Sequence, residues 1–334
     1  MRDEQATRET RRIAICGDVM LGRLVNDYIP QRGYEYPWGD VLPLLRDADA
    51  FLINQEFALT SSTTPWNPEG KVFHFRADPE MIAALQAANV SFSCLANNHI
   101  GDFDVTGLLE TLEILDRAGI AHAGAGRNDA EASAPALLDV RGLTIAIVAF
   151  TDQMREWIAG PDQPGINYTP ISVEPDAFQP VARSIQEARA RADLIIFSIH
   201  WGPNMRTRPP EHFQEFARRV IDAGADLFWG HSAHILQGIE IHRGKPILYD
   251  TGDFVDDYAV DPELRNDLTA LFVLEIGPSR IESLDLYPCR IDRMQVNLAE
   301  APERGWLFDS IAERCAEFGT SIGSSLDHFE VVLS

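Results

Sequence analysis

The chain has 334 residues, of which 45% are hydrophobic and 24% are charged, an ordinary composition for a soluble globular protein. Its formal net charge of −23 argues against nucleic acid or an anionic membrane surface as a partner, because both require concentrated Lys and Arg. No apolar run reaches the roughly 18 residues of a membrane-spanning helix, so no span is predicted.

The first residues are polar and of mixed charge, and they lack the apolar core of a secretion signal. We predict a disordered lead-in at residues 1–12, followed by a single domain at 13–334. The four cysteines show no paired spacing, and Cys16 and Cys94 lie inside apolar runs, where a thiol behaves as a small core residue. This pattern favours a reducing compartment, and we expect a cytoplasmic protein.

Apolar runs alternate with helical patterns along most of the chain. Several runs are hydrophobic on successive residues, which is typical of strands buried on both faces. Strands are predicted at 13–16, 50–53, 92–95, 144–150, 194–199, 227–229 and 247–249. Helices are predicted at 79–88, 105–118, 181–191 and 213–223. Strands that alternate with helices indicate a layered α/β domain.

The last third has a different character. Residues 268–276 and 281–288 alternate in polarity around Gly277-Pro278-Ser279, which predicts a hairpin of half-exposed strands, and a helix is predicted at 303–318. Two long loops, 60–71 and 154–170, are rich in turn residues. Loops of that length often wall a binding site, and Trp66, Trp157 and Tyr168 would give such walls aromatic surface.

Polar clusters follow five of the apolar runs. Ligands of α/β folds bind beyond the carboxyl ends of strands, so side chains at these points are expected to meet. A lone His after a strand is usually only hydrogen-bonded, but several strand ends that each deliver Asp, Asn, Glu or His predict a metal site. The clusters are Gly17-Asp18, Asn54-Gln55-Glu56, Asn97-Asn98-His99, His200-Trp201-Gly202 and Gly230-His231-Ser232-Ala233-His234.

These motifs together resemble the CapA family of bacterial capsule or poly-gamma-glutamate biosynthesis proteins. The resemblance also rests on Met20-Leu21-Gly22-Arg23, Asp102, Gly124-Ala125-Gly126 and Gly224-Ala225-Asp226, and it spans about residues 13–258. The family is similar in fold to calcineurin-like metallophosphoesterases. The resemblance therefore implies an α/β fold, a four-layer α/β/β/α sandwich of the metallophosphoesterase type, with the C-terminal hairpin and helix at 268–320 added to it.

The resemblance also implies roles for single residues. His99 corresponds to a catalytic histidine that protonates the leaving group, and Asp102, three residues later, is well placed to orient it. Carboxylate, amide oxygen and imidazole together suit one or two divalent ions such as Mn, Fe, Zn or Ni. The implied metal ligands are Asp18, Glu56, Asn98, His200, His231 and His234.

The sequence departs from the phosphoesterase and family patterns at several positions. Met20 stands where phosphoesterases have His, and because a thioether is a poor ligand for these ions, the first metal site is expected to be weak or empty. Ser232-Ala233 replace the His-Pro that the family usually carries. Asp250 and Asp253 stand where Ser and Asn are more frequent, and they add carboxylates that act as acid or base, or that cap turns.

Three residues are predicted to contact substrate: Arg23, Trp201 and Asp253. Arg23 pairs either with an anionic substrate group or with one of the many acids, and Trp201 belongs either to a substrate wall or to the core. Many capsule proteins of the family carry an N-terminal membrane anchor, and none is predicted here, which argues against a direct role in capsule export.

Three function classes remain open at this point. The first is a metal-dependent enzyme that hydrolyses a phosphoester or an amide bond in a peptide or polyglutamate-like substrate. The second is a metal-dependent peptide epimerase, in which acid and base groups invert a Cα centre. The third is a non-catalytic assembly factor for poly-gamma-glutamate, because a fold by itself does not determine activity.

Overall fold

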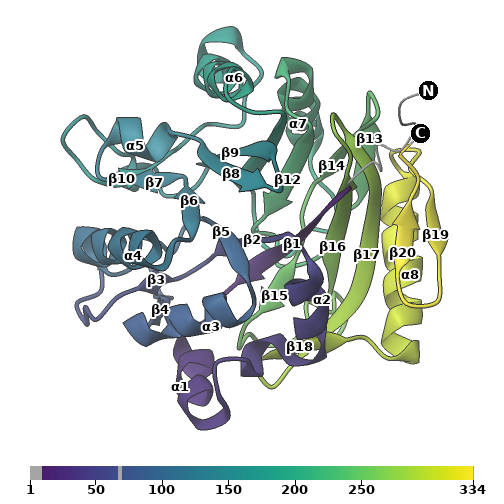
Figure 1. The fold of residues 1–334 in the computed structure, drawn as a ribbon, viewed down its shortest axis with the longest axis horizontal. Helices are drawn as coiled ribbons and strands as arrows, with labels where there is room; N and C mark the ends of the chain where they lie inside the picture. The colour runs from purple at the N-terminus through teal and green to yellow at the C-terminus, as the bar shows by residue number, and fades with distance from the viewer. Residues whose placement is uncertain (1–9, 67–69, 334) are drawn as a thin grey trace, which may run out of the picture.

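The computed structural model describes residues 10–66 and 70–333, and two stacked β-sheets form its centre (Figure 1). The first sheet runs in the order β19 (Ile322–Ser324), β20 (Phe329–Val331), β17 (Ile281–Asp292), β16 (Leu268–Ile276), β1 (Arg11–Val19), β2 (Ala50–Gln55), β5 (Val90–Cys94) and β6 (Ala121–Ala123). Two further strands extend it, β15 (Asp253–Val255) beside β1 and β18 (Gln295–Leu298) beside β17.

The second sheet runs in the order β13 (Ile239–His242), β14 (Lys245–Leu248), β12 (Leu227–His231), β11 (Leu194–His200), β9 (Leu143–Thr151) and β8 (Ala136–Val140). Within it, the successive pairs from β9 through β11 and β12 to β14 are parallel. Two short pairs lie outside both sheets, β3 (Ala58–Leu59) with β4 (Arg76–Ala77), and β7 (Ala125–Gly126) with β10 (Gly165–Ile166).

The helices cover the outer faces of the two sheets. Beside the first sheet lie α1 (Arg23–Arg32), η1 (Tyr36–Val41), α2 (Leu42–Asp47), η2 (Pro79–Met81), α3 (Ile82–Ala87) and α4 (Asp104–Ala118) (Figure 1). Beside the second lie α6 (Pro175–Arg189) and α7 (Glu211–Ala223). The short α5 (Asp129–Ser133) contacts β7 and β10, and the turn η3 (Arg155–Trp157) precedes β10.

Three hydrophobic cores separate these four layers. Because successive side chains of a strand point to opposite faces, Ile13 and Ile15 of β1 pack into the core between the sheets, whereas Ala14 and Cys16 pack under the helices. A third core joins the second sheet to α6 and α7. The chain is therefore the four-layer α/β/β/α sandwich that the resemblance implied, and α8 (Ala301–Ala316) closes one end by adding Leu307 and other side chains to the core between the sheets.

The predicted strands and helices are present, and some of their limits are corrected. Residues 1–9 of the predicted lead-in lie outside the described residues, but β1 already begins at Arg11. Helix α6 begins at Pro175 rather than at 181, because proline suits the first helical position, and the helix continues through Pro180. The division into a lead-in and a single domain stays a prediction.

The predicted hairpin exists, but it is not half-exposed throughout. β16 pairs with β17 on one side and with β1 on the other, so it lies inside the first sheet with both faces covered. All of its residues except Glu275 are buried. The four cysteines are buried and unpaired. Within the described residues, no helix combines the length and the apolar character needed to cross a bilayer.

Candidate metal centre

Strands from both sheets end at the same place and bring their polar side chains together. In the first sheet, β1 runs parallel to β2 and to β15, so Asp18 lies in register with Asn54 on one side and with Asp253 on the other. In the second sheet, β11 and β12 are parallel, and His200 lies in register with His231. The parallel pairing of strands thus explains why residues so distant in sequence meet.

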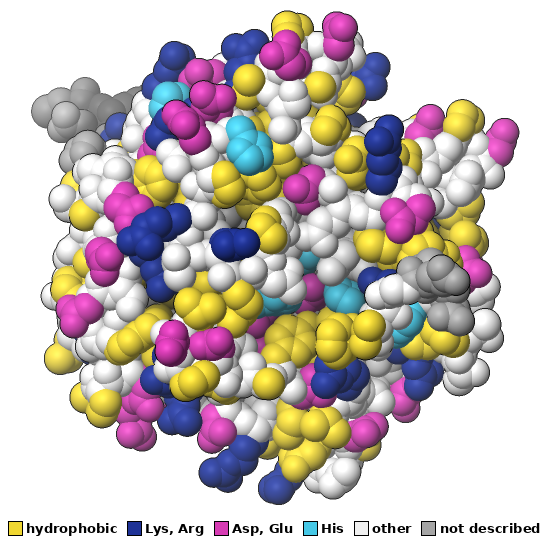
Figure 2. All heavy atoms as spheres, turned by 180° about the vertical axis from the view of Figure 1, so that it is seen from behind, with side chains coloured by type: hydrophobic (Ala, Val, Ile, Leu, Met, Phe, Trp, Pro, Cys, Tyr) yellow, Lys and Arg dark blue, Asp and Glu magenta, His cyan; other side chains and the backbone are white. Residues whose placement is uncertain are grey.

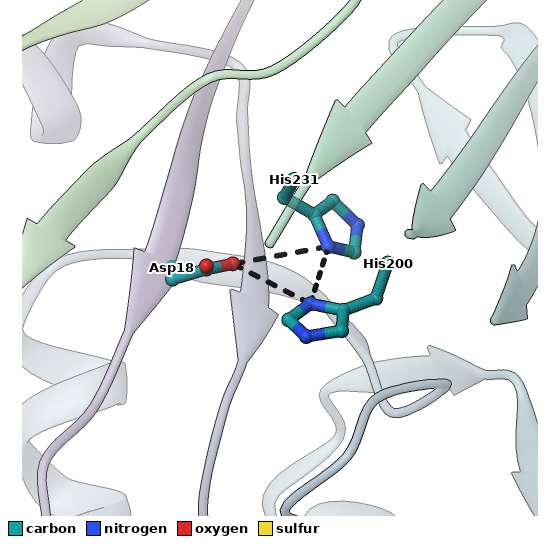
Figure 3. Close-up of side chains that lie close together, drawn as sticks. All are labelled: Asp18, His200 and His231. Atoms are coloured by element: carbon teal, nitrogen blue, oxygen red, sulfur yellow. Dashed lines mark hydrogen bonds and ion pairs between the residues drawn. The ribbon is translucent and has the colours of Figure 1, made fainter. Parts of the chain in front are cut away.

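The first candidate ligand group consists of Asp18, His200 and His231, all fully or almost fully buried (Figure 3). Asp18 Oδ1 lies 3.8 Å from the Nδ1 atom of each histidine, and the two Nδ1 atoms are 3.1 Å apart. A four-coordinate ion with bonds of about 2.1 Å holds its ligand atoms roughly 3.4 Å apart. The spacing therefore suits a divalent ion between the three side chains.

The second candidate group shares Asp18 and adds Glu56, His234 and Asp253. His234 Nδ1 lies 2.7 Å from Asp253 Oδ1 and 3.5 Å from Asp18 Oδ2. Glu56 Oε1 lies 3.8 Å from His200 Nε2, which connects this group to the first. Because Asp18 belongs to both groups, two ions at this end of the sandwich would share its carboxylate.

The backbone around His231 and His234 is unusual for its residue types. Ser232 has φ 114° and His234 has φ 61°, in a region that residues other than glycine rarely adopt. Such strain persists only where the surroundings fix it, and it concentrates at functional sites. Gly230 is required here, since a Cβ atom would lie 2.1 Å from the carbonyl oxygen of Tyr249.

The buried histidines differ in their protonation. Burial lowers the pKa of His231 to about 3 and that of His200 well below its usual value, so both are neutral near pH 7 and able to bind a metal. Ser198 Oγ lies 3.0 Å from His231 Nε2 and leaves Nδ1 facing Asp18. Burial alone would lower the pKa of His234, but Asp253 and Glu56 raise it well above its usual value.

Several buried polar atoms of the centre have no hydrogen-bond partner. Leaving a buried acceptor unpaired costs about 1–3 kcal/mol, and more for a charged group, so a cluster of such atoms in one place is unfavourable unless a cation binds it. Carboxylate, amide and imidazole donors match the preference of borderline divalent ions. The residues therefore fit a metal centre, and the unpaired atoms of the two ligand groups are Asp18 Oδ2, Glu56 Oε1, His200 Nε2 and Asp253 Oδ2. Asn98 Oδ1 is also unpaired, and Asn98 lines the cavity beside these groups.

His99 and Asp102 form a buried pair beside these donors. His99 Nδ1 lies 2.6 Å from Asp102 Oδ2, so its Nε2 atom faces the centre, 3.8 Å from Glu56 Oε1. Lys71 Nζ lies 3.0 Å from the other oxygen of Asp102 and donates to the carbonyl of Asn98. The ring of Phe75 stacks on His99 at 3.9 Å. These contacts hold the imidazole in one orientation.

A cavity of about 640 Å³ opens beside the centre. His99, His234 and Asn98 form part of its lining, and Phe75 and Tyr258 add aromatic surface. Figure 2 shows histidine and acidic side chains set among hydrophobic ones near the middle of this face. A substrate in the cavity can therefore reach both the donor atoms and the free nitrogen of His99.

The three predicted substrate contacts have different positions. Arg23 lines the cavity and pairs with Asp257 at 3.2 Å. Asp253 belongs to the second ligand group rather than to a separate substrate site. Of the two positions predicted for Trp201, a substrate wall or the core, the structure shows the core: its ring packs against Phe213 and its Nε1 donates to the backbone carbonyl of Tyr249.

Asp250, Asp253 and Met20, which depart from the family and phosphoesterase patterns, have different surroundings. Asp250 accepts the backbone N–H groups of Ala233 and Gly252, so it caps a turn, whereas Asp253 faces His234. The thioether of Met20 accepts the N–H of Gly22 and packs in the core under the helices. Asp253 is thus a carboxylate of the second ligand group. The weakness that Met20 predicts for one metal site stays a prediction.

Sequence reasoning missed some residues around the centre. Tyr258 donates to Glu56 Oε2 at 3.0 Å, and Asn54 donates to Asp18 Oδ1 at 2.7 Å. Asn54 belongs to the cluster Asn54-Gln55-Glu56 at the end of a predicted strand, and this position could have indicated that it lies near the centre. Tyr258 and Lys71 stand in no motif. The aromatic walls were expected from Trp66, Trp157 and Tyr168, but the first two pack on each other and Tyr168 lines a separate cavity.

The chain matches one protein family and is similar in sequence to several proteins of known name. The family described as "Bacterial capsule synthesis protein PGA_cap" matches residues 12–258. A "Probable polyglutamine synthesis accessory protein" of Mycobacterium tuberculosis is 34% identical over 96% of this chain and 95% of its own length. The "PGA biosynthesis protein CapA" of Bacillus subtilis is 31% identical over 80% of this chain and 69% of its own.

Among solved structures, a hypothetical protein from Thermus thermophilus covers 83% of this chain and 98% of its own, with a TM-score of 0.48 and 15% identity. A 5'-nucleotidase from Candida albicans has a TM-score of 0.41 and 12% identity over 82% of this chain and 48% of its own. The family match and the extent of the similarity to the mycobacterial relative are decisive. The chain belongs to the PGA_cap family of bacterial capsule synthesis proteins.

Proposed function

We propose that this PGA_cap protein is a metal-dependent hydrolase that cleaves a phosphoester or amide bond in the cavity beside the metal centre. One observation carries the proposal: buried unpaired donor atoms from both sheets converge next to a held His–Asp pair. The proposed ligands are Asp18, Glu56, Asn98, His200, His231, His234 and Asp253. When bound, divalent ions at these ligands would polarise the scissile group and lower the pKa of the attacking water.

His99 is the proposed proton donor to the leaving group. Asp102 and Lys71 are held together on the far side of the imidazole, so Nε2 is the nitrogen that faces the cavity. A positioned acid within reach of the leaving group typically contributes about 10²–10⁴-fold in rate. The stacked ring of Phe75 excludes water from one face of His99 and keeps it in this orientation.

Tyr258 and Asn54 are proposed to position two of the ligands. Tyr258 holds one oxygen of Glu56, which leaves Oε1 for the centre. Asn54 donates to Oδ1 of Asp18, and Oδ2 of Asp18 stays without a partner. Hydrogen bonds of this kind orient metal ligands and typically change affinity or activity by about 10–100-fold.

The test combines metal analysis with a substrate panel. Protein purified without added metal is analysed for Mn, Fe, Zn and Ni, and is then assayed with phosphomonoesters, phosphodiesters, peptides and polyglutamate in water labelled with ¹⁸O. We expect bound divalent metal and ¹⁸O in the product of at least one substrate. The control is His99→Ala, which should keep the metal and lose most of the turnover.

Other outcomes distinguish the alternatives. Deuterium uptake at a peptide Cα without bond cleavage would show an epimerase instead of a hydrolase. Tight binding of polyglutamate without turnover would show an assembly factor, as the word "accessory" in the mycobacterial relative's description suggests for that protein. Protein that takes up no divalent metal would contradict the proposal as a whole.

A further inference from the structure

A row of aromatic rings leads from the surface to both histidines that line the cavity. Phe73, which is 60% exposed, lies 6.4 Å from Phe75, and Phe75 lies 5.7 Å from Tyr258. Tyr258 in turn lies 5.4 Å from His234. We call Phe73, Phe75 and Tyr258 the aromatic wall. Its three rings all line the cavity, from the exposed Phe73 at the surface to Tyr258 beside the proposed reaction site.

The cationic side chains that line the same cavity already have anionic partners. In the described part of the lining, the Arg and Lys side chains are Arg23 and Lys71. Arg23 pairs with Asp257, and its guanidinium also lies over the rings of Phe73 and Phe75 at 5.9 and 5.6 Å. Lys71 pairs with Asp102 and donates to the carbonyl of Asn98. Their charges are therefore largely compensated before any substrate enters.

The net charge of the whole chain also disfavours a polyanionic ligand. With a net charge of −23, the protein repels a polyanion at long range. Sites that bind chains of anionic groups usually present several Arg or Lys side chains along the path of the ligand. Here the aromatic wall offers the ring of Phe73 and, beside it, the side chain of Val72, which are 60% and 78% exposed.

We infer, on the basis of the proposed hydrolase function, that the substrate carries an apolar or aromatic group directly beside the single phosphoester or amide group that is cleaved. The apolar group lies against the aromatic wall, and the reacting group lies at the metal centre. Recognition of a run of carboxylates is not built into this cavity. The wall therefore determines specificity, while the centre determines the chemistry.

The expected size of this preference follows from buried area. Burial of one aromatic ring against apolar surface strengthens binding by about 10- to 100-fold. The exposed ring of Phe73 contributes part of that surface. It lies against Phe75 and the guanidinium of Arg23, neither of which is a proposed ligand, so its removal should leave the centre intact. Phe73 is thus the appropriate residue to change.

The experiment measures binding of two phosphonates that differ only in the apolar group. Protein loaded with Mn²⁺ is titrated calorimetrically with methylphosphonate and with benzylphosphonate, and separately with glutamate and a gamma-linked glutamate pentamer. We expect benzylphosphonate to bind at least about tenfold more tightly than methylphosphonate, and the pentamer to bind no more tightly than glutamate. Phe73→Ala should reduce the benzyl-to-methyl ratio, and Phe73→Leu should reduce it less.

The matched control is Leu326→Ala, which removes an apolar side chain that is 91% exposed and does not line this cavity. It should leave the ratio unchanged. Equal affinity for the two phosphonates, or affinity that rises with the number of glutamates, overturns this inference but leaves the proposed hydrolase in place. Failure to take up Mn²⁺ together with failure to bind either phosphonate overturns both.

Discussion

Two buried polar clusters lie in this sandwich, and they differ in whether their atoms are paired. On the face of the second sheet that α7 covers, Glu240 of β13 accepts hydrogen bonds from Arg218 at 2.7 Å and from Tyr249 at 2.6 Å, so both of its oxygens are used. At the candidate metal centre, Asp18 and Glu56 each keep one oxygen without a partner. The carboxylates of both clusters are buried, and burial alone therefore does not distinguish them.

The comparison shows which observation identifies a functional cluster. Buried polar groups are normally hydrogen-bonded, and the exceptions require an explanation. The Glu240 cluster is complete by itself and ties α7 to β13 and to the residue that follows β14. The candidate metal centre is incomplete, because atoms of Asp18, Glu56, His200 and Asp253 have no hydrogen-bond partner there. Removing a member should therefore affect stability in one cluster and function in the other.

The largest expected effect is loss of metal from the centre. His231→Ala and His234→Ala should each abolish high-affinity metal binding and activity, because each removes one member of a ligand group, while the circular dichroism spectrum stays that of a folded protein. His242→Ala, which removes an imidazole paired with Asp222 away from the centre, is the control. Retention of metal by both ligand variants would show that the assignment is wrong.

His99→Ala should lower turnover by about 10²–10⁴-fold without loss of metal, because the role proposed for His99 is proton transfer and not metal binding. Elemental analysis and kcat measured on the same preparation check this expectation. Unchanged turnover would remove the catalytic assignment of His99. Loss of metal in this variant would instead place His99 among the ligands.

Glu240→Ala should lower the stability of the protein and leave its metal content unchanged. The variant leaves the hydroxyl of Tyr249 without its partner, and we expect a loss of about 1–3 kcal/mol in the free energy of unfolding with metal content unchanged. The loss is smaller than for a fully buried ion pair, because Arg218 is 38% exposed. Denaturant unfolding measures it, and reduced metal content in folded Glu240→Ala protein would contradict the distinction between the clusters.

The smallest expected effect is that of Asp102→Asn. The amide keeps a contact with His99 but loses the charge that stabilises the protonated imidazole, so turnover should fall by about 10- to 100-fold, less than in His99→Ala. Steady-state kinetics of the two variants side by side provide the check. A larger loss in Asp102→Asn than in His99→Ala would contradict the positioning role.

Much of the centre could be predicted from sequence because its residues follow buried strands directly. Asp18, His200 and His231 each end an apolar run, and the parallel order of strands brings such ends together. For Trp201, which directly follows His200, the sequence left a substrate wall and the core open, and the side chain lies in the core. Adjacent residues of an extended chain point in opposite directions, so a histidine facing the centre directs the next side chain into the outer core.

Other parts could not be predicted from local patterns. Tyr258 and Lys71 come from irregular segments whose position depends on tertiary contacts with Glu56 and Asp102. β16 reads as a hairpin strand in isolation, and its burial follows from pairing with β1, which lies at the other end of the chain. Long-range pairing of this kind leaves no periodic signal in either segment.

The central claim is that the unpaired donors around Asp18 form a metal centre, and the most direct test is metal-dependent stability. Metal-free wild-type protein and Asp18→Asn are unfolded thermally with and without Mn²⁺ or Zn²⁺. A ligand at about 100 times its Kd stabilises the folded state by about 2.7 kcal/mol, so the wild-type Tm should rise clearly with metal, while Asp18→Asn should gain little and should be at least as stable as the wild type without metal. Equal stabilisation of both proteins, or of neither, would contradict the account.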